Sequence, residues 1–115
     1  MPSKKVAEIV VSTLEAAGVQ HCYGIVGDTL NHVTDAIHRS KIQWVHVRHE
    51  EAAAFAAGAE SYISGNLTAC AGSCGPGSLH FINGIYEAQR NRAPVVLIAS
   101  PVSYTHLTLP TNREV

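Results

Sequence analysis

Two adjacent carboxylates, Glu50 and Glu51, stand at the start of an alanine-rich stretch that runs to Glu60. The structural interpretation is that acidic residues are favoured at a helix N-terminus, by about 0.3–1 kcal/mol each, because of the helix dipole. The functional interpretation is a buried carboxylate, since the small side chains behind it let a planar ligand or a second subunit approach closely. Burial would raise the pKa of this carboxylate and the helix end would lower it, so both outcomes stay open.

A glycine-rich stretch, Gly72 to Gly77, is the second candidate for a site. It lacks the Gly-Lys-Ser/Thr of a Walker loop and the spacing of the dinucleotide fingerprint, so it is either a tight strand-to-helix connection or a loop that faces a ligand. The histidines His46, His49 and His80 have no metal-binding spacing, and we expect no metal site from them.

Apolar periodicity predicts the elements that must position these residues. A helix is expected over residues 4–17, with Ser3 as its cap and Gly18 at its end. Asp28 is placed to cap a second helix, and Pro76 lies near the first turn of the last one. The expected helices after the first span residues 29–39, 50–64 and 79–89, and the expected strands span residues 20–26, 42–47, 67–71 and 94–99.

The strands are continuous apolar runs that alternate with helices, which is typical of parallel sheets. We therefore predict an α/β fold, a three-layer doubly wound parallel sheet with helices on both faces, and a last strand buried on both faces by its composition. Ligands bind at the carboxyl ends of the strands in such folds. Those ends carry Val26-Gly27-Asp28, His49-Glu50 and the glycine-rich stretch, so we expect all three on one rim.

Composition narrows the class of protein. The 115 residues allow one domain at most, and the net charge of −1 from eight basic and nine acidic side chains predicts no nucleic-acid or anionic-lipid binding. No secretory signal pattern opens the chain, and no apolar run approaches the roughly 20 residues of a membrane span, so we expect a cytoplasmic protein. Cys22, Cys70 and Cys74 are expected to be buried free thiols.

Four short motifs, in order and spacing over residues 4–100, carry a resemblance. They are Arg48-His49-Glu50-Glu51 with the alanines behind it, the run from Cys70 to His80, Asn83-Gly84, and Ala93-Pro94-Val95. Together they resemble the N-terminal pyrimidine-binding domain of thiamine-diphosphate enzymes of the pyruvate oxidase and acetolactate synthase group. The stretch Tyr23 to Asp28 resembles the first glycine turn of that family.

Within the group, three features resemble the quinone-dependent pyruvate dehydrogenases, also called pyruvate oxidases, most closely. These are the run Cys70 to Gly77, the run Asn91-Arg92-x-Pro94-Val95, and Gly27-Asp28 in the first turn. Enzymes of that kind decarboxylate pyruvate oxidatively to acetate and carbon dioxide and pass electrons through a flavin to a quinone. An acetolactate synthase-type carboligase is the nearest alternative.

The resemblance assigns roles to individual residues. It makes Glu50 the carboxylate that contacts N1′ of the aminopyrimidine of thiamine diphosphate, with Glu51 as a neighbour. That contact favours the imino tautomer, which removes the proton from the thiazolium C2. The resemblance also implies that Val26, Gly27 and Asp28 bind the cofactor. It implies the same role for the loop residues Cys74, Gly75, Pro76 and Gly77, the last three through their backbone.

Other parts of the implied site lie outside this chain. In the family, Mg²⁺ and the diphosphate are bound by a C-terminal domain, FAD by a middle domain, and the site forms between two subunits of a homo-oligomer. The expected substrate is pyruvate or another 2-oxo acid, and contact with the inner face of a membrane is expected only for the full-length protein. This chain alone is therefore expected to be inactive.

The resemblance stops after Ser100, and residues 101–115 have neither helical nor strand periodicity. The stretch Val102 to Thr111 resembles the translation of a transposase-type sequencing adapter. We therefore expect residues 1–100 to be a partial N-terminal thiamine-diphosphate (pyrimidine) binding domain and residues 101–115 to be a non-native tail. A native but irregular extension is the alternative.

Two further classes of protein stay open. A free-standing flavodoxin-like module would bind a nucleotide or phosphate at Gly72 to Gly77 and would cover its sheet edges, whereas a fragment would expose apolar surface around residues 94–99. A polypeptide that does not fold stably without its partner surface would lack a cooperative thermal transition.

Overall fold

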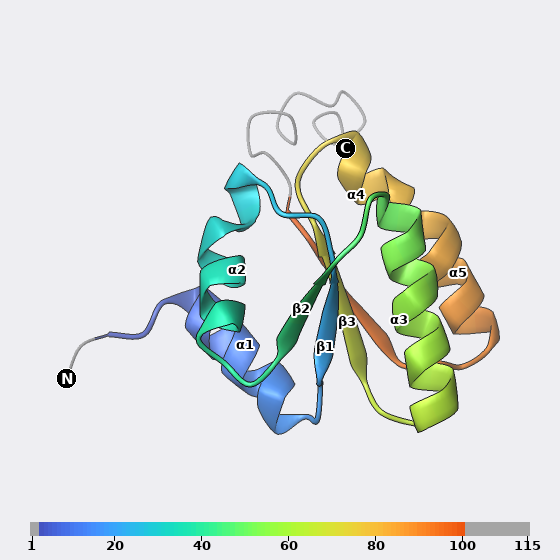
Figure 1. The fold of residues 1–115 in the computed structure, drawn as a ribbon, viewed down its shortest axis with the longest axis horizontal. Coiled ribbons are helices and arrows are strands. Elements are labelled where there is room, and N and C mark those ends of the chain that lie inside the picture. The colour runs from blue at the N-terminus through green and yellow to red at the C-terminus, as the bar shows by residue number, and fades with distance from the viewer. Residues whose placement is uncertain (1–2, 101–115) are drawn as a thin grey trace, which may run out of the picture.

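The computed structural model describes residues 3–100, which form a four-stranded sheet with helices on both faces (Figure 1). The helices are α1 (Val6–Ala16), α2 (Asn31–His38), α3 (Glu50–Ser64), α4 (Pro76–His80) and α5 (Ile82–Arg90), and a 3₁₀ turn, η1 (Asp28–Leu30), precedes α2. The strands are β1 (His21–Gly24), β2 (Gln43–His46), β3 (Thr68–Gly72) and β4 (Val95–Ala99).

All strand pairs are parallel, and the strand order is β2-β1-β3-β4. In the register, Cys22 of β1 lies between Trp44 of β2 and Ala69 of β3, and Ala69 faces Val96 of β4. Every residue of β3 is buried. Parallel strands place their carboxyl ends at one edge, so the segments that follow β1, β2 and β3 share a rim.

The two faces of the sheet have separate apolar cores. Helices α1 and α2 cover one face, and α3 and α5 cover the other (Figure 1). The first core is built from large aliphatic side chains such as Leu14, Leu30 and Ile37, whereas the second is built mostly from alanines of α3 around Cys70 and Phe81. This arrangement confirms the predicted α/β fold with a doubly wound parallel sheet.

Helix α3 has the bounds predicted from the sequence. His49 is its N-cap, and its Nδ1 accepts a hydrogen bond from the backbone N–H of Glu51 at 3.0 Å. Gly65 ends the helix in the left-handed conformation, with φ of 77°, which glycine adopts without a steric penalty. The cap holds the first turn in place, and this turn carries both candidate carboxylates.

Small residues bring α3 and α5 into close contact. A Cβ atom at Gly84 of α5 would lie 2.9 Å from the backbone carbon of Ala54 and 2.9 Å from the backbone nitrogen of Phe55. Ala53, Ala54 and Ala57 are fully buried in this layer. The helices can pack this closely only because these positions lack bulk.

Three details at the helix starts differ from the sequence-based expectations. Ser3 does not cap α1: the N-cap is Lys5, whose backbone N–H donates to the Glu8 carboxylate at 3.0 Å. Asp28 begins η1 instead of capping it, and Gly27 is the N-cap. At α1, the acidic side chain at the third helical position takes the place of the expected cap. At η1, backbone hydrogen bonds stabilise the turn instead.

The predicted helix over residues 79–89 is two helices in the structure, and it begins earlier, at Pro76. The break lies at Phe81, which is fully buried, because its ring packs against Gly72, where a Cβ would meet the ring edge. Burying this aromatic ring outweighs the benefit of a continuous helix. Propensity alone predicts no break there.

The last strand, β4, is not buried on both faces as predicted. Four of its residues are half-buried and Ala99 is exposed, because β4 pairs only with β3 among the described strands. An apolar groove runs beside it, lined by Ile82, Ile85, Tyr86, Gln89 and Leu97. Apolar surface is therefore exposed along this strand.

The cysteines follow the prediction in part. Cys22 and Cys70 are free and buried, and burial raises the pKa of each thiol to about 12. Cys74 is also free, but it is only half-buried, because it lies in the loop after β3. No helix among residues 3–100 is both long and apolar enough to cross a membrane.

A polar contact joins β1 to α3 on the second face. The Tyr23 hydroxyl donates to the Glu60 carboxylate at 2.6 Å, and His21 Nδ1 lies 3.0 Å from the same carboxylate. Burial and the hydrogen bond to Glu60 raise the pKa of Tyr23 to about 12. Burial acts to raise the pKa of Glu60 too, but the hydrogen bonds from Tyr23 and His21 outweigh it and lower this pKa.

The packing of α3 on α5 predicts opposite effects for two glycine substitutions. Gly84→Ala should lower the free energy of unfolding by about 1–3 kcal/mol, because the new methyl group meets the α3 backbone. Gly58→Ala is the matched control: its methyl group would lie 3.5 Å from the Ala88 Cβ, an ordinary contact. Alanine is favoured over glycine inside a helix by about 0.5–1 kcal/mol, so this variant should be at least as stable as the parent. Urea unfolding measures both, and equal stability would contradict the packing.

The Tyr23–Glu60 contact predicts a pH dependence of stability. Between about pH 10 and pH 12 the folded chain keeps the Tyr23 proton that the unfolded chain loses, so stability falls as pH rises through this range. Tyr23→Phe should remove this part of the fall and should lower stability at neutral pH by about 1–3 kcal/mol. The rest of the fall remains, because the raised pKa values of Cys22 and Cys70 act in the same direction above about pH 9. Denaturant unfolding at several pH values measures this. The account would be contradicted if the free energy of unfolding fell with pH equally steeply in the parent and in the variant.

Candidate functional site

The carboxylate of Glu50 is the centre of the rim at the carboxyl ends of the strands. Glu50 is the first residue of α3, directly after the connection from β2, and its side chain is 15% exposed. The buried alanines of α3 pack into the core around Cys70 and Phe81. The Glu50 carboxylate, at the start of this helix, is largely enclosed.

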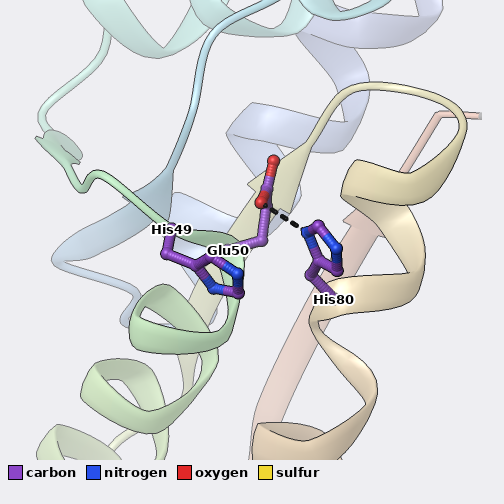
Figure 2. A group of neighbouring side chains, drawn as sticks. All are labelled: His49, Glu50 and His80. Carbon is purple, nitrogen blue, oxygen red and sulfur yellow. Dashed lines mark hydrogen bonds and ion pairs between the residues drawn. The ribbon is translucent and has the colours of Figure 1, made fainter.

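Two histidines lie beside this carboxylate (Figure 2). His80, at the end of α4, has its Nδ1 3.1 Å from Glu50 Oε1. The rings of His49 and His80 are stacked, with their centroids 4.7 Å apart and their planes at 22°. Residues 30 positions apart in the sequence thus meet at one point.

The glycine-rich loop forms a wall beside Glu50. A Cβ atom at Gly77 would lie 2.9 Å from Glu50 Oε2, so the carboxylate rests against the bare backbone of the loop. Gly75 has a φ of 79°, a conformation that favours glycine, and Pro76 occupies the first turn of α4. The loop thus presents backbone to this side of the site.

The first glycine turn contacts the other end of the same loop. A Cβ at Gly27 would lie 2.5 Å from the Ser73 Cβ, and Thr29 Oγ1 lies 2.9 Å from Ser73 Oγ. The backbone N–H of Cys74 donates to Thr29 Oγ1 at 3.3 Å. Because η1 places Thr29 toward the loop, the turn and the loop form one continuous surface.

The predicted site residues therefore fall into two neighbouring groups. Glu50 and Gly77 are in contact, and Gly27 contacts the loop through Ser73. Within residues 3–100 no hydrogen bond joins Val26 or Asp28 to Glu50, and Val26 is exposed. The loop after β3 connects the two groups.

Glu51, expected only as a neighbour of Glu50, has a partner of its own. The Asn83 side-chain amide donates to Glu51 Oε2 at 2.6 Å and so ties the first turn of α3 to α5. The sequence signal for this contact was Asn83 itself, a polar residue on a helix whose inner face is apolar. Glu51 is thus engaged by α5, whereas Glu50 is the carboxylate that lies against the loop.

The histidine group differs from the one considered in the sequence analysis. His46 is exposed on β2 and does not belong to it. His49 and His80 do meet, together with Glu50, and each offers one ligand atom within 4.8 Å of the others. Sequence spacing could not indicate this group, because its members come from different elements.

The geometry suits exchange of a proton with a flat ring. One carboxylate oxygen of Glu50 contacts His80, and the other lies over the backbone of Gly77. A carboxylate held in this way can exchange a proton with a ring nitrogen that comes within hydrogen-bond reach. Carboxylates in such positions act as general acids or bases or hold one tautomer of the ligand.

Comparison with known proteins gives the chain a family. Residues 4–113 match the thiamine pyrophosphate enzyme family, N-terminal TPP binding domain. The chain is 39% identical over 107 residues to the pyruvate oxidase of Lactiplantibacillus plantarum, which covers 91% of this chain and 18% of that protein. It is 38% identical over 96 residues to the catabolic acetolactate synthase of Raoultella terrigena, which covers 84% of this chain and 17% of that protein.

A third relative is more similar but carries no activity in its name. It is an uncharacterized 42.6 kDa protein in the isoamylase 3′ region of Pseudomonas amyloderamosa, 55% identical over 103 residues, or 89% of this chain and 26% of that protein. The chain thus spans about a quarter or less of the curated relatives it matches. The family match covers nearly the whole chain, and the chain belongs to the thiamine pyrophosphate enzyme family, in which it matches the N-terminal TPP binding domain.

Proposed function

We propose that this chain is the pyrimidine-binding part of a thiamine-diphosphate enzyme that decarboxylates pyruvate oxidatively to acetate and carbon dioxide. The observation that carries the proposal is the Glu50 carboxylate, 15% exposed, with one oxygen against the bare backbone of Gly77. In this assignment Glu50 holds or exchanges a proton at N1′ of the aminopyrimidine. Thiamine diphosphate, when bound, supplies the carbanion-stabilising chemistry.

The residues present fit an aminopyrimidine. A Cβ at Gly75 would meet no atom within 4 Å, so the loop has open space there, and a flat ring can lie along a backbone that has no side chain. Gly75, Pro76 and the half-buried Cys74 continue this wall, and Val26, Gly27 and Asp28 lie beyond Ser73 on the same rim. These residues would bind the cofactor mainly through backbone atoms.

His80 and His49 would assist Glu50 without touching the reacting carbon. His80 Nδ1 contacts Glu50 Oε1, which orients the carboxylate and leaves Oε2 for the ring. His49 stacks on His80 and caps α3, so it restricts the orientation of both partners. Both histidines would be positioning residues in this assignment.

The choice of reaction rests on relatives. The match to a pyruvate oxidase supports oxidation of pyruvate or another 2-oxo acid. The family resemblance of the motifs adds FAD and Mg²⁺, bound by domains outside this chain, and a quinone as the final electron acceptor to the proposal. The similar match to an acetolactate synthase supports a carboligase of the same substrate class. We place the oxidase first because the Cys70 to Gly77 and Asn91 to Val95 runs resemble that branch. The full-length enzyme would be a homo-oligomer with its site between subunits.

A free-standing flavodoxin-like module is the alternative from another class. The apolar groove beside β4 argues against this alternative, because a free-standing module would cover the sheet edge at β4. The family match also favours a cofactor-binding part of a larger enzyme. A flavodoxin-like module would bind flavin mononucleotide or a phosphate at Gly72 to Gly77 and would not require Glu50.

Substitution of Glu50 tests the central role. In the full-length enzyme that contains this segment, Glu50→Gln should lower the rate of hydrogen–deuterium exchange at the thiazolium C2 by at least about 100-fold, the usual contribution of general acid–base catalysis. Glu51→Gln is the matched control: its carboxylate is engaged by Asn83, so exchange should continue within a few-fold of the parent rate. Proton NMR of the acid-quenched cofactor measures both rates. Equal rates for parent and Glu50→Gln would overturn the role of Glu50.

We also propose that residues 1–100 are a partial domain and residues 101–115 a non-native tail. The tail lies outside the described residues, and the family match extends through most of it, to residue 113. The sequence of the genomic DNA shows whether residues 101–115 are native or non-native. Beyond codon 100 it should continue into a middle domain and a later Gly-Asp-Gly motif, with codons that differ from those of residues 101–115. If the genome encodes residues 101–115 as given, the tail is native.

A further inference from the structure

Three side chains that can ligate a metal ion meet between the first turn of α3 and the end of α4. His49, Glu50 and His80 each offer one ligand atom, and these atoms lie within 4.8 Å of one another (Figure 2). His80 and Glu50 are already 3.1 Å apart, and the two imidazole rings lie face to face. The donor atoms are thus close together, but imidazole lone pairs lie in the ring plane, so one ring has to turn out of the stack for both nitrogens to point at one ion.

The donor set has a definite chemical preference. Two imidazoles and one carboxylate are the protein ligands of Zn²⁺ in many three-ligand sites, and imidazole also suits Cu²⁺ and Ni²⁺. In a tetrahedral site two donors of one such ion are about 3.3 Å apart, since each lies about 2 Å from it. Donor atoms that lie within 4.8 Å of one another thus need to approach by up to about 1.5 Å.

The side chains have the freedom for this movement. The His80 side chain is 47% exposed and lies on the short helix α4, and His49 is exposed at the N-cap of α3. Glu50 is more enclosed, and its position would set where the ion lies. The site thus has one fixed and two adjustable ligands.

One feature of the fold opposes a cation here, and two existing contacts would be lost when the ion binds. The positive end of the α3 dipole repels it, but Glu50 and Glu51 place two carboxylates in that first turn. The Nδ1 of His49 accepts the Glu51 N–H, and a metal on that nitrogen would take the place of this bond. The contact between His80 and Glu50 would be replaced by an ion that bridges them.

We propose that His49, Glu50 and His80 form a three-ligand site for a divalent transition-metal ion of the Zn²⁺ class. Water fills the fourth position. The inference goes beyond the proposed function, because it requires no thiamine cofactor and no other domain. Its test on the cofactor-free chain therefore stands or fails separately from the role of Glu50 in catalysis.

Calorimetric titration of the complete 115-residue chain with Zn²⁺ tests the site. The parent should bind one ion, and His49→Gln and His80→Gln should each weaken binding by at least about 10-fold, the loss seen even for partners outside the ligand shell. His46→Gln is the matched control, since His46 is exposed but lies outside the group, and it should bind as the parent does. Circular dichroism of each variant checks that the fold is kept.

Co²⁺ provides a second measurement on the unaltered chain. Its visible absorption should indicate nitrogen and oxygen ligands, and its paramagnetism should shift the NMR signals of the His49 and His80 rings. A sulfur-to-cobalt charge-transfer band would instead place the ion on a thiol such as Cys74 and would overturn the proposal. Equal Zn²⁺ affinity in the parent and both histidine variants, or no binding by the parent, would overturn it as well.

Discussion

The close packing of α3 between the sheet and α5 is the constraint on which the site depends. Ala53, Ala54 and Ala57 are fully buried, and Gly84 of α5 lies directly against the α3 backbone. A helix held by so many small contacts has little freedom to shift along its axis, because interiors packed at this density transmit displacement. The position of its first residue, Glu50, therefore follows from packing that lies one to two turns away.

Polar contacts complete what the packing begins. Asn83 ties the first turn of α3 to α5, and the Ser61 hydroxyl ties its last turns to the carbonyl oxygen of Pro94 at 2.9 Å. His80, the last residue of α4, then contacts Glu50 directly before the break at Phe81. The buried ring of Phe81 thus fixes the chain next to the histidine that contacts Glu50.

The sequence predicted the elements well wherever a local signal was strong. The bounds of α3 followed from the acidic pair at one end and Gly65-Asn66 at the other, and the parallel sheet followed from apolar strands such as β3. Both are consequences of local composition and periodicity. The family, too, could be identified from short motifs in order.

The remaining features depend on contacts between distant segments, which spacing does not reveal. The break at Phe81 arises because Gly72 offers its ring a place, and the half-exposed β4 reflects which strands lie next to it. The pairing of Glu50 with His80 joins residues 30 positions apart, so two histidines without a metal-binding pattern in the sequence still meet. A sequence read alone could single out Glu50 but could not show its partners.

The structure of the full-length enzyme with thiamine diphosphate bound is the most direct measurement of the central claim. We predict that a carboxylate oxygen of Glu50 lies about 2.6–3.2 Å from N1′ of the aminopyrimidine, with the ring along the backbone of Gly75 to Gly77. Glu51 should keep its contact with Asn83. A bound cofactor whose N1′ contacts Glu51, or no carboxylate of this segment, would contradict the account.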